Sequence, residues 1–104
     1  MDNRNHQRFL IQRRVQLRTS SGHVVPGMTR DLSFGGSFIE CDTANLQSGE
    51  ECTLLIMLDD GAGSIEIFGD ICYSNNHGVG CQFLTFDSEY YQFLTHYSLE
   101  SPDS

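Results

Sequence analysis

The chain has 104 residues, which are enough for one domain and leave few residues outside it. It has 6 basic and 14 acidic residues and a formal net charge of −8, which argues against a domain that coats DNA or RNA polymers, because such domains need a basic face. The longest apolar run, 54–58, is far too short to span a bilayer, and the polar N-terminus lacks the apolar segment of a secretory signal. We therefore expect a cytoplasmic protein without membrane insertion.

The first element along the chain is a polar arm, residues 1–12, which we expect to be flexible. All six basic residues of the chain are arginines and lie within residues 1–30, which hold one acid and so carry a charge of +5. Residues 31–104 hold 13 acids and no base, a charge of −13. The chain is therefore an arginine-rich arm joined to an acidic body.

Six segments with strand patterns follow the arm. Apolar and polar residues alternate in them, or a short apolar run stands between turn residues. The segments are Arg14–Thr19, His23–Arg30, Ser37–Cys41, Cys52–Leu58, Ile65–Tyr73 and Val79–Phe86. We expect Pro26-Gly27 to form a bulge or an edge position, and the almost wholly apolar run 52–58 to be a central strand. Short strands at even spacing with tight turns indicate an antiparallel barrel.

One helix is predicted at the C-terminal end, over residues 87–98. Asp87 is a candidate N-cap, and aromatic and aliphatic residues then recur at helical spacing at Tyr90, Phe93, Leu94 and Tyr97. We expect this amphipathic helix to close the end of the barrel, so that residues 13–98 form one barrel-and-helix domain. Residues 99–104 are expected to be a disordered tail.

No residue set typical of catalysis or metal binding is visible. The four cysteines, Cys41, Cys52, Cys72 and Cys81, contain no C-x-x-C pair, so we expect reduced thiols rather than a zinc or redox site. No Ser/His/Asp or paired-carboxylate arrangement can be recognised either. We therefore expect neither an enzyme nor a protein with a metal or a cofactor.

Two short motifs carry the functional information. The first is an R-x-x-x-R formed by Arg4 and Arg8 in the arm, and the second is a D-x-S-x-x-G over residues 31–36, between two predicted strands. Each motif is weak alone. Their order, the 22 residues between Arg8 and Asp31, and the barrel pattern make the combination much more specific.

In this arrangement the sequence resembles the PilZ domain family, bacterial receptors for cyclic dimeric GMP (cyclic di-GMP). The resemblance also includes the Gly-Gly-Ser-Phe-Ile-Glu run at 35–40 and the Gly-Val-Gly-Cys-Gln-Phe run at 78–83, and it covers roughly residues 3–97. It implies an all-β fold with one C-terminal helix, namely a six-stranded antiparallel split barrel. It further implies a stand-alone receptor or adaptor whose ligand site contains Arg4, Arg8, Asp31, Ser33, Gly35 and Gly36.

The chemistry of these residues suits a cyclic dinucleotide with two phosphates and two guanines. A guanidinium is planar and permanently charged, and it can bind a phosphate or the O6 and N7 atoms of guanine with two parallel hydrogen bonds. Asp31 can accept hydrogen bonds from guanine N1–H and N2–H₂, and Ser33 offers a hydroxyl. Gly35 and Gly36 allow the ligand to approach the backbone closely.

Several alternatives stay open at this point. Asp31 and Ser33 can stabilise a turn instead of, or in addition to, contacting ligand. Whether Arg13, Arg14 or His6 contacts ligand is not decided by the sequence. Many family members carry a basic residue where this chain has Asn3, which leaves ligand stoichiometry and affinity open.

Two functional hypotheses follow from the sequence. In the first, cyclic di-GMP is clamped by the arm and the 31–36 motif, and the conformational change alters contacts with an unidentified effector protein. In the alternative, the chain is a degenerate PilZ-like barrel that acts as a nucleotide-independent protein-interaction module.

Overall fold

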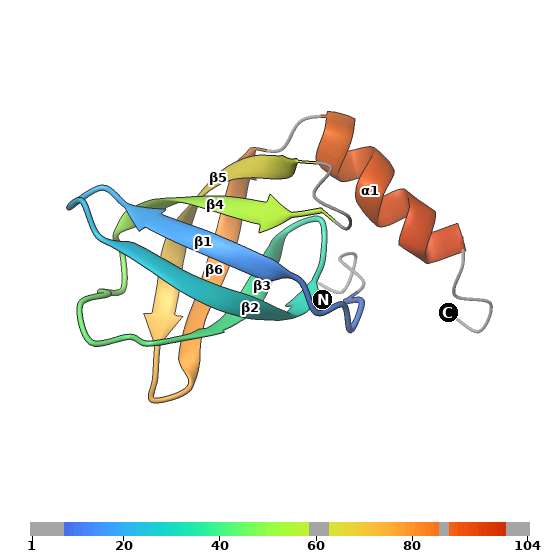
Figure 1. The fold of residues 1–104 in the computed structure, drawn as a ribbon. Coiled ribbons are helices and arrows are strands. Elements are labelled where there is room, and N and C mark those ends of the chain that lie inside the picture. The colour runs from blue at the N-terminus through green and yellow to red at the C-terminus, as the bar shows by residue number, and fades with distance from the viewer. Residues whose placement is uncertain (1–7, 59–62, 86–87, 100–104) are drawn as a thin grey trace, which may run out of the picture.

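A computed structural model describes residues 8–58, 63–85 and 88–99 of the chain. In this part of the chain the fold is six strands followed by one helix (Figure 1). The elements are β1 (Arg14–Thr19), β2 (Val24–Leu32), β3 (Gly36–Cys41), β4 (Glu51–Met57), β5 (Ser64–Ser74), β6 (Gly78–Thr85) and α1 (Ser88–Leu99). The predicted fold class, an all-β barrel with one C-terminal helix, is confirmed.

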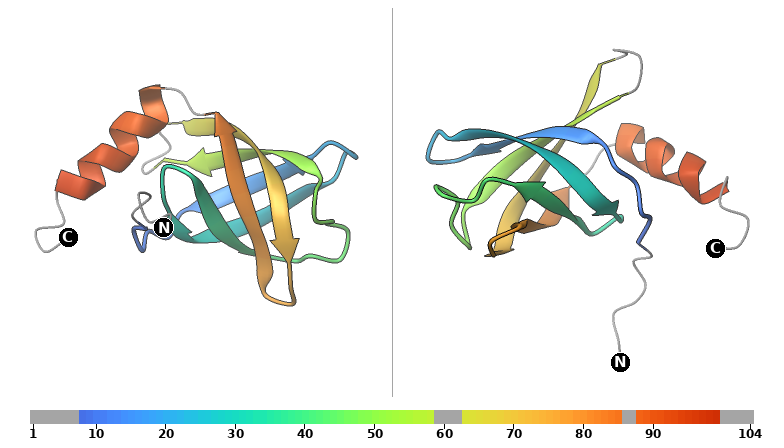
Figure 2. Two further views of the ribbon diagram at one scale, coloured as in Figure 1. Left: turned by 180° about the vertical axis from the view of Figure 1, so that it is seen from behind. Right: turned by 60° about the horizontal axis from the view of Figure 1, so that its bottom comes forward.

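The six strands close into an antiparallel barrel with the order β1-β2-β3-β6-β5-β4, in which β4 pairs back onto β1. Each named strand therefore has a partner on both sides, so the barrel exposes no continuous open edge. The helix α1 lies at one end of the barrel (Figures 1 and 2). No helix among the described residues is long and apolar enough to cross a bilayer.

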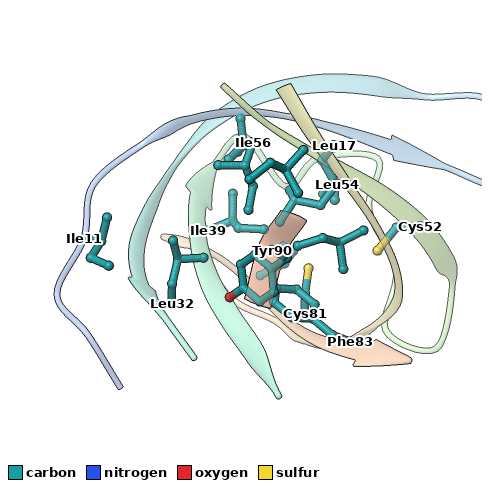
Figure 3. Close-up of a cluster of buried hydrophobic side chains, with 14 of the residues drawn as sticks. Ile11, Leu17, Leu32, Ile39, Cys52, Leu54, Ile56, Cys81, Phe83 and Tyr90 are labelled. Carbon is teal, nitrogen blue, oxygen red and sulfur yellow. The ribbon is translucent and has the colours of Figure 1, made fainter. Parts of the chain in front are cut away.

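The core lies inside the barrel and is built from alternate residues of each strand (Figure 3). In β4 the side chains of Cys52, Leu54 and Ile56 point inward and are at most 6% exposed. Met57, by contrast, is 37% exposed on the outer face. As expected for a central strand, β4 pairs with β1 on one side and with β5 on the other. A strand of a closed barrel nevertheless buries one face only, however apolar its outward residues are.

The arm joins the barrel earlier than the sequence suggested. Phe9 and Ile11 are 8% and 7% exposed and belong to the core cluster. Phe9 exchanges backbone hydrogen bonds with Leu32 in both directions, at 2.8 and 2.9 Å, and the Thr29 hydroxyl donates to the Ile11 carbonyl at 2.6 Å. The expected boundary at residue 12 therefore moves to Phe9, and the expected flexible segment 1–7 lies outside the described residues.

The irregularity in β2 is not at Pro26-Gly27. Pro26 pairs in regular register with Gln16 of β1, and pairing with β3 begins only at Gly27. Pro26, which has no N–H to donate, therefore occupies an edge-like position with a neighbour on one side. The bulge lies between Thr29 and Asp31 instead.

The helix α1 closes one end of the core with the residues that the sequence pattern selected. Tyr90 and Leu94 are fully buried, and Phe93 packs against the core cluster. The expected N-cap Asp87, the side chain of Tyr97 and tail residues 100–104 lie outside the described part of the chain.

Candidate functional site

The segment 31–36 is part strand and part tight turn. Asp31 and Leu32 belong to β2, and Gly36 starts β3, so only residues 33–35 connect the two strands. The Ser33 N–H donates to the Gly36 carbonyl at 2.9 Å, and the Ser33 hydroxyl oxygen accepts from the N–H groups of Gly35 and Gly36 at 3.2 and 3.0 Å. Ser33 thus stabilises the turn with its own side chain.

Asp31 links the two strands and holds the arm. Its side chain accepts the Phe38 N–H at Oδ1 and the Arg8 Nη1–H at Oδ2, each at 3.0 Å. The Asp31 side chain is 12% exposed, whereas the Arg8 side chain is 70% exposed. Because a guanidinium has five N–H donors, Arg8 can hold Asp31 and still present donors to a second partner.

Gly36 is required by close packing between β3 and β6. A Cβ atom at this position would lie 2.3 Å from the carbonyl oxygen of Cys81, a backbone atom that cannot easily move away. The glycine therefore lets the strand after the turn approach its neighbour.

These residues border a groove on the outer surface of β3, β5 and β6. Its volume is about 760 Å³, within the range of roughly 300–1,000 Å³ typical of small-molecule sites. Of the six predicted site residues, Arg8, Ser33, Gly35 and Gly36 line the groove, and Asp31 adjoins it through Arg8. The sixth, Arg4, lies outside the described residues.

Other lining residues were not found by sequence reasoning. They include outward-facing residues of neighbouring strands and one aromatic residue of the turn, namely Phe34, Phe38, Cys72, Tyr73, Gly80, Gln82 and Leu84. The signal that could have found part of this set is the two-residue periodicity of β6, which places Gly80, Gln82 and Leu84 on one face. Arg13 and Arg14 do not line this groove.

The turn is tied to the C-terminal helix through Tyr90. The Tyr90 hydroxyl donates to the Ser33 carbonyl at 2.5 Å. Burial, with a smaller contribution from the negative charge of Asp31, raises the pKa of Tyr90 well above its usual value, so the hydroxyl stays protonated and can donate. The Phe34 ring packs between the helix residues Tyr90 and Tyr91, with ring centroids 6.4 and 5.5 Å away. A displacement of the turn would therefore change its contacts with α1.

Arg30 borders the site without lining it. Its guanidinium pairs with Glu40 at 2.8 Å and lies 4.6 Å from the ring centroid of Phe38. Arg30 thus pairs with an acidic residue of β3.

The four cysteines are free thiols, and Cys72 is exposed at the groove. The hydrogen bond with Cys52 and burial both raise the pKa of Cys81, which keeps that thiol neutral. No group of three or more potential metal ligands occurs among the residues that the structure describes.

Comparison with known proteins matches the PilZ domain over residues 2–100. Two similar solved structures correspond in length. The PilZ domain of YcgR from Escherichia coli with c-di-GMP is 17% identical (TM-score 0.74, 98% of this chain and 95% of that one). The PilZ domain of CeSA from a cellulose-synthesizing bacterium is 19% identical (TM-score 0.72, 90% and 98%).

A third similar structure is the inhibitor of motility MotI/DgrA of Bacillus subtilis, at 18% identity and TM-score 0.74. The match covers 96% of this chain but 51% of that protein, so the chain spans about half its length. No curated protein sequence gives a significant match.

Proposed function

Because the chain belongs to the PilZ domain family, we propose that it is a receptor for cyclic di-GMP and not an enzyme. The observation that carries the proposal is the Arg8–Asp31 pair, which holds an exposed guanidinium over a glycine-containing turn at the groove. The similarity to a solved structure of a PilZ domain with c-di-GMP supports the choice of ligand.

In the proposed complex, Arg8 supplies the charge-assisted hydrogen bonds to a phosphate or a guanine edge. Asp31 orients the guanidinium through Oδ2. Since an ionised carboxylate has about four acceptor sites, Asp31 keeps capacity for guanine N–H donors as well. Arg4, four residues before Arg8, is proposed as the second clamp. Ser33, Gly35 and Gly36 form the turn against which the ligand packs.

The charge distribution fits a compact anion better than a nucleic-acid polymer. The excess of arginine is confined to residues 1–30, whereas residues 31–104 carry −13. A small dianion need meet only the basic region, but a long phosphate backbone would also meet the acidic body, which repels it.

The proposed output is a change of contact with an effector protein. Ligand at the turn would act on α1 through the Tyr90–Ser33 hydrogen bond and the contact between Phe34 and Tyr91. The receptor would thus be an adaptor whose two states differ in the surface they display.

One observation favours the alternative, a nucleotide-independent interaction module. Asp31 and Ser33 both have structural roles without ligand, because they join β2 to β3 and stabilise the turn. A protein that no longer bound nucleotide would therefore still need these two residues for its fold.

Calorimetric titration of the full chain with cyclic di-GMP tests the proposal. Arg8→Ala should weaken binding by about 1.5–3 kcal/mol, the range for a hydrogen bond to a charged group. Arg18→Ala is the matched control, because Arg18 is an exposed arginine of β1 that does not line the groove. Binding should also weaken with added salt. If the unaltered chain does not bind cyclic di-GMP, the receptor proposal is wrong and the interaction module is favoured.

A further inference from the structure

Tyr73 of β5 is a large aromatic side chain that stays 48% exposed inside the groove. The register places it in one cross-strand row with Gly80 of β6 and Phe38 of β3. That row lies two residues along β3 from Gly36, which is about 7 Å at the usual strand rise. Tyr73 therefore stands at a different part of the groove from the turn and Arg8.

The ring of Tyr73 packs against the backbone of Gly80, where the absence of a side chain leaves room for it. A Cβ atom on Gly80 would lie 2.1 Å from Cε1 and 2.5 Å from Cζ of Tyr73, so the ring lies directly over the glycine. Any other residue at position 80 would lift the ring off the barrel surface. The packing fixes one face of the ring and leaves the rest of the side chain open to the groove.

A second aromatic ring stabilises the same position from the side. Phe38 is 8% exposed although it lies outside the core cluster of the barrel. Its ring centroid is 6.1 Å from that of Tyr73, with an interplanar angle of 38°, and Arg30 covers it from 4.6 Å. The outer surface thus carries a packed row of Arg30, Phe38 and Tyr73, in which Phe38 is buried and Tyr73 is the exposed aromatic residue.

Gln82, two residues after Gly80 in β6, can form hydrogen bonds with the edge of a base. Gln82 pairs with Gly36, between the turn and the Tyr73 row, and its side chain is exposed in the groove. A side-chain amide carries both an acceptor oxygen and two donor hydrogens, the combination needed for a bidentate contact with a base. The Cys72 thiol lies 3.5 Å from Oε1 of Gln82.

We propose that Tyr73 is a base-stacking residue of the groove, on which one nucleobase of the ligand lies while Arg8 holds another part of the same molecule. This inference rests on the proposed function and assigns a contact outside both sequence motifs. An exposed ring that is fixed on one face stacks with little loss of side-chain freedom, and every nucleobase has a π-face to offer. Gln82 lies beside the stacked base and contacts its edge.

The test is calorimetric titration of the full chain and its variants with cyclic di-GMP. Tyr73→Ala should bind about 5- to 140-fold more weakly, the loss expected for one base–aromatic stack. Tyr73→Phe keeps the ring and should bind like the unaltered chain. Phe68→Ala is the matched control, because Phe68 is an aromatic residue of the same strand that is 52% exposed and does not line the groove.

A spectroscopic readout reports the stack directly. The chain contains no tryptophan, so Tyr73→Trp introduces a single indole at the proposed contact. Its fluorescence should change on addition of cyclic di-GMP and saturate at the concentrations found by calorimetry.

The possible outcomes separate this inference from the proposed function. If the unaltered chain binds and Tyr73→Ala binds equally well, the Tyr73 assignment is wrong and the receptor proposal stands. If Tyr73→Phe binds as weakly as Tyr73→Ala, the hydroxyl makes the contact and stacking is refuted. If the unaltered chain does not bind cyclic di-GMP, both proposals fall together.

Discussion

The hydrogen bond from Tyr90 to Ser33 joins the C-terminal helix to the turn of the groove, and replacing Tyr90 with Phe removes this bond while keeping the aromatic ring. The side chain is fully buried, and the phenylalanine ring fills nearly the same space. The substitution therefore leaves the packing of α1 on the barrel intact and deprives the Ser33 carbonyl of a 2.5 Å donor.

The expected loss of stability follows from the position of the acceptor. A buried polar group that loses its partner costs about 1–3 kcal/mol, more than the net gain of forming an average hydrogen bond. Ser33 is 7% exposed, so water cannot easily replace the phenol. We expect Tyr90→Phe to lower the free energy of unfolding by that amount, and the melting temperature by roughly 4–8 °C for each kcal/mol.

Urea unfolding at several pH values adds a second readout. The pKa of Tyr90 is raised in the folded chain, whereas it is about 10 in the unfolded chain. The contribution of the protonated hydroxyl is therefore complete below pH 10 and is lost as the pH rises toward the folded pKa, because the unfolded chain releases its proton first. The stability difference between the unaltered chain and Tyr90→Phe should shrink above pH 10.

Tyr91→Phe is the matched control for this experiment. Tyr91 is the next residue of α1 and is 54% exposed, so removing its hydroxyl should change stability by less than about 0.5 kcal/mol. Equal stability of Tyr90→Phe and the unaltered chain at neutral pH would refute the proposed tie between helix and turn. A difference that stayed constant up to pH 11 would contradict the reasoning about the raised pKa.

Two further predictions concern the groove. Iodoacetamide should label the exposed Cys72 before the buried Cys81, as followed by mass spectrometry. Cyclic di-GMP should slow the labelling of Cys72, which lines the groove. A labelling rate that saturating cyclic di-GMP leaves unchanged would contradict the proposal that the ligand covers Cys72. Gly36→Ala should destabilise the fold by about 1–3 kcal/mol in urea unfolding, because the added Cβ would lie 2.3 Å from the Cys81 carbonyl oxygen. An unchanged urea midpoint for Gly36→Ala would mean that β3 and β6 are not so closely spaced.

Strand positions were predictable from the sequence because burial in a barrel alternates with a period of two. Val15 and Leu17 of β1 are buried, in agreement with the alternation of apolar and polar residues in Arg14–Thr19. The sequence places Phe9 and Ile11 in the arm, because polar residues and arginines surround them. Their burial depends on a space beside β2 that exists only after the barrel has closed.

The lining of the groove was predictable where a local motif forms it and not where pairing register forms it. The order of Arg8 and the 31–36 motif identified one wall of the groove. The contact of Tyr73 with Gly80 depends on the irregular register of β5 and β6 between Ile71 and Tyr73, which no residue pattern encodes. A bulge shifts which residues share a face, so a strict two-residue period misplaces the residues beyond it.

The backbone bridge between Phe9 and Leu32 also limits how far the arm can extend from the site. Arg8 precedes this fixed point by one residue, and Arg4 is four residues further back, so its Cα can lie at most about 14 Å from that of Arg8. A short tether of this kind gives the tethered group an effective concentration in the millimolar range at its target. In the proposed complex, contact of Arg4 with a ligand that Arg8 already holds would be an intramolecular ring closure, independent of protein concentration and sensitive to inserted residues.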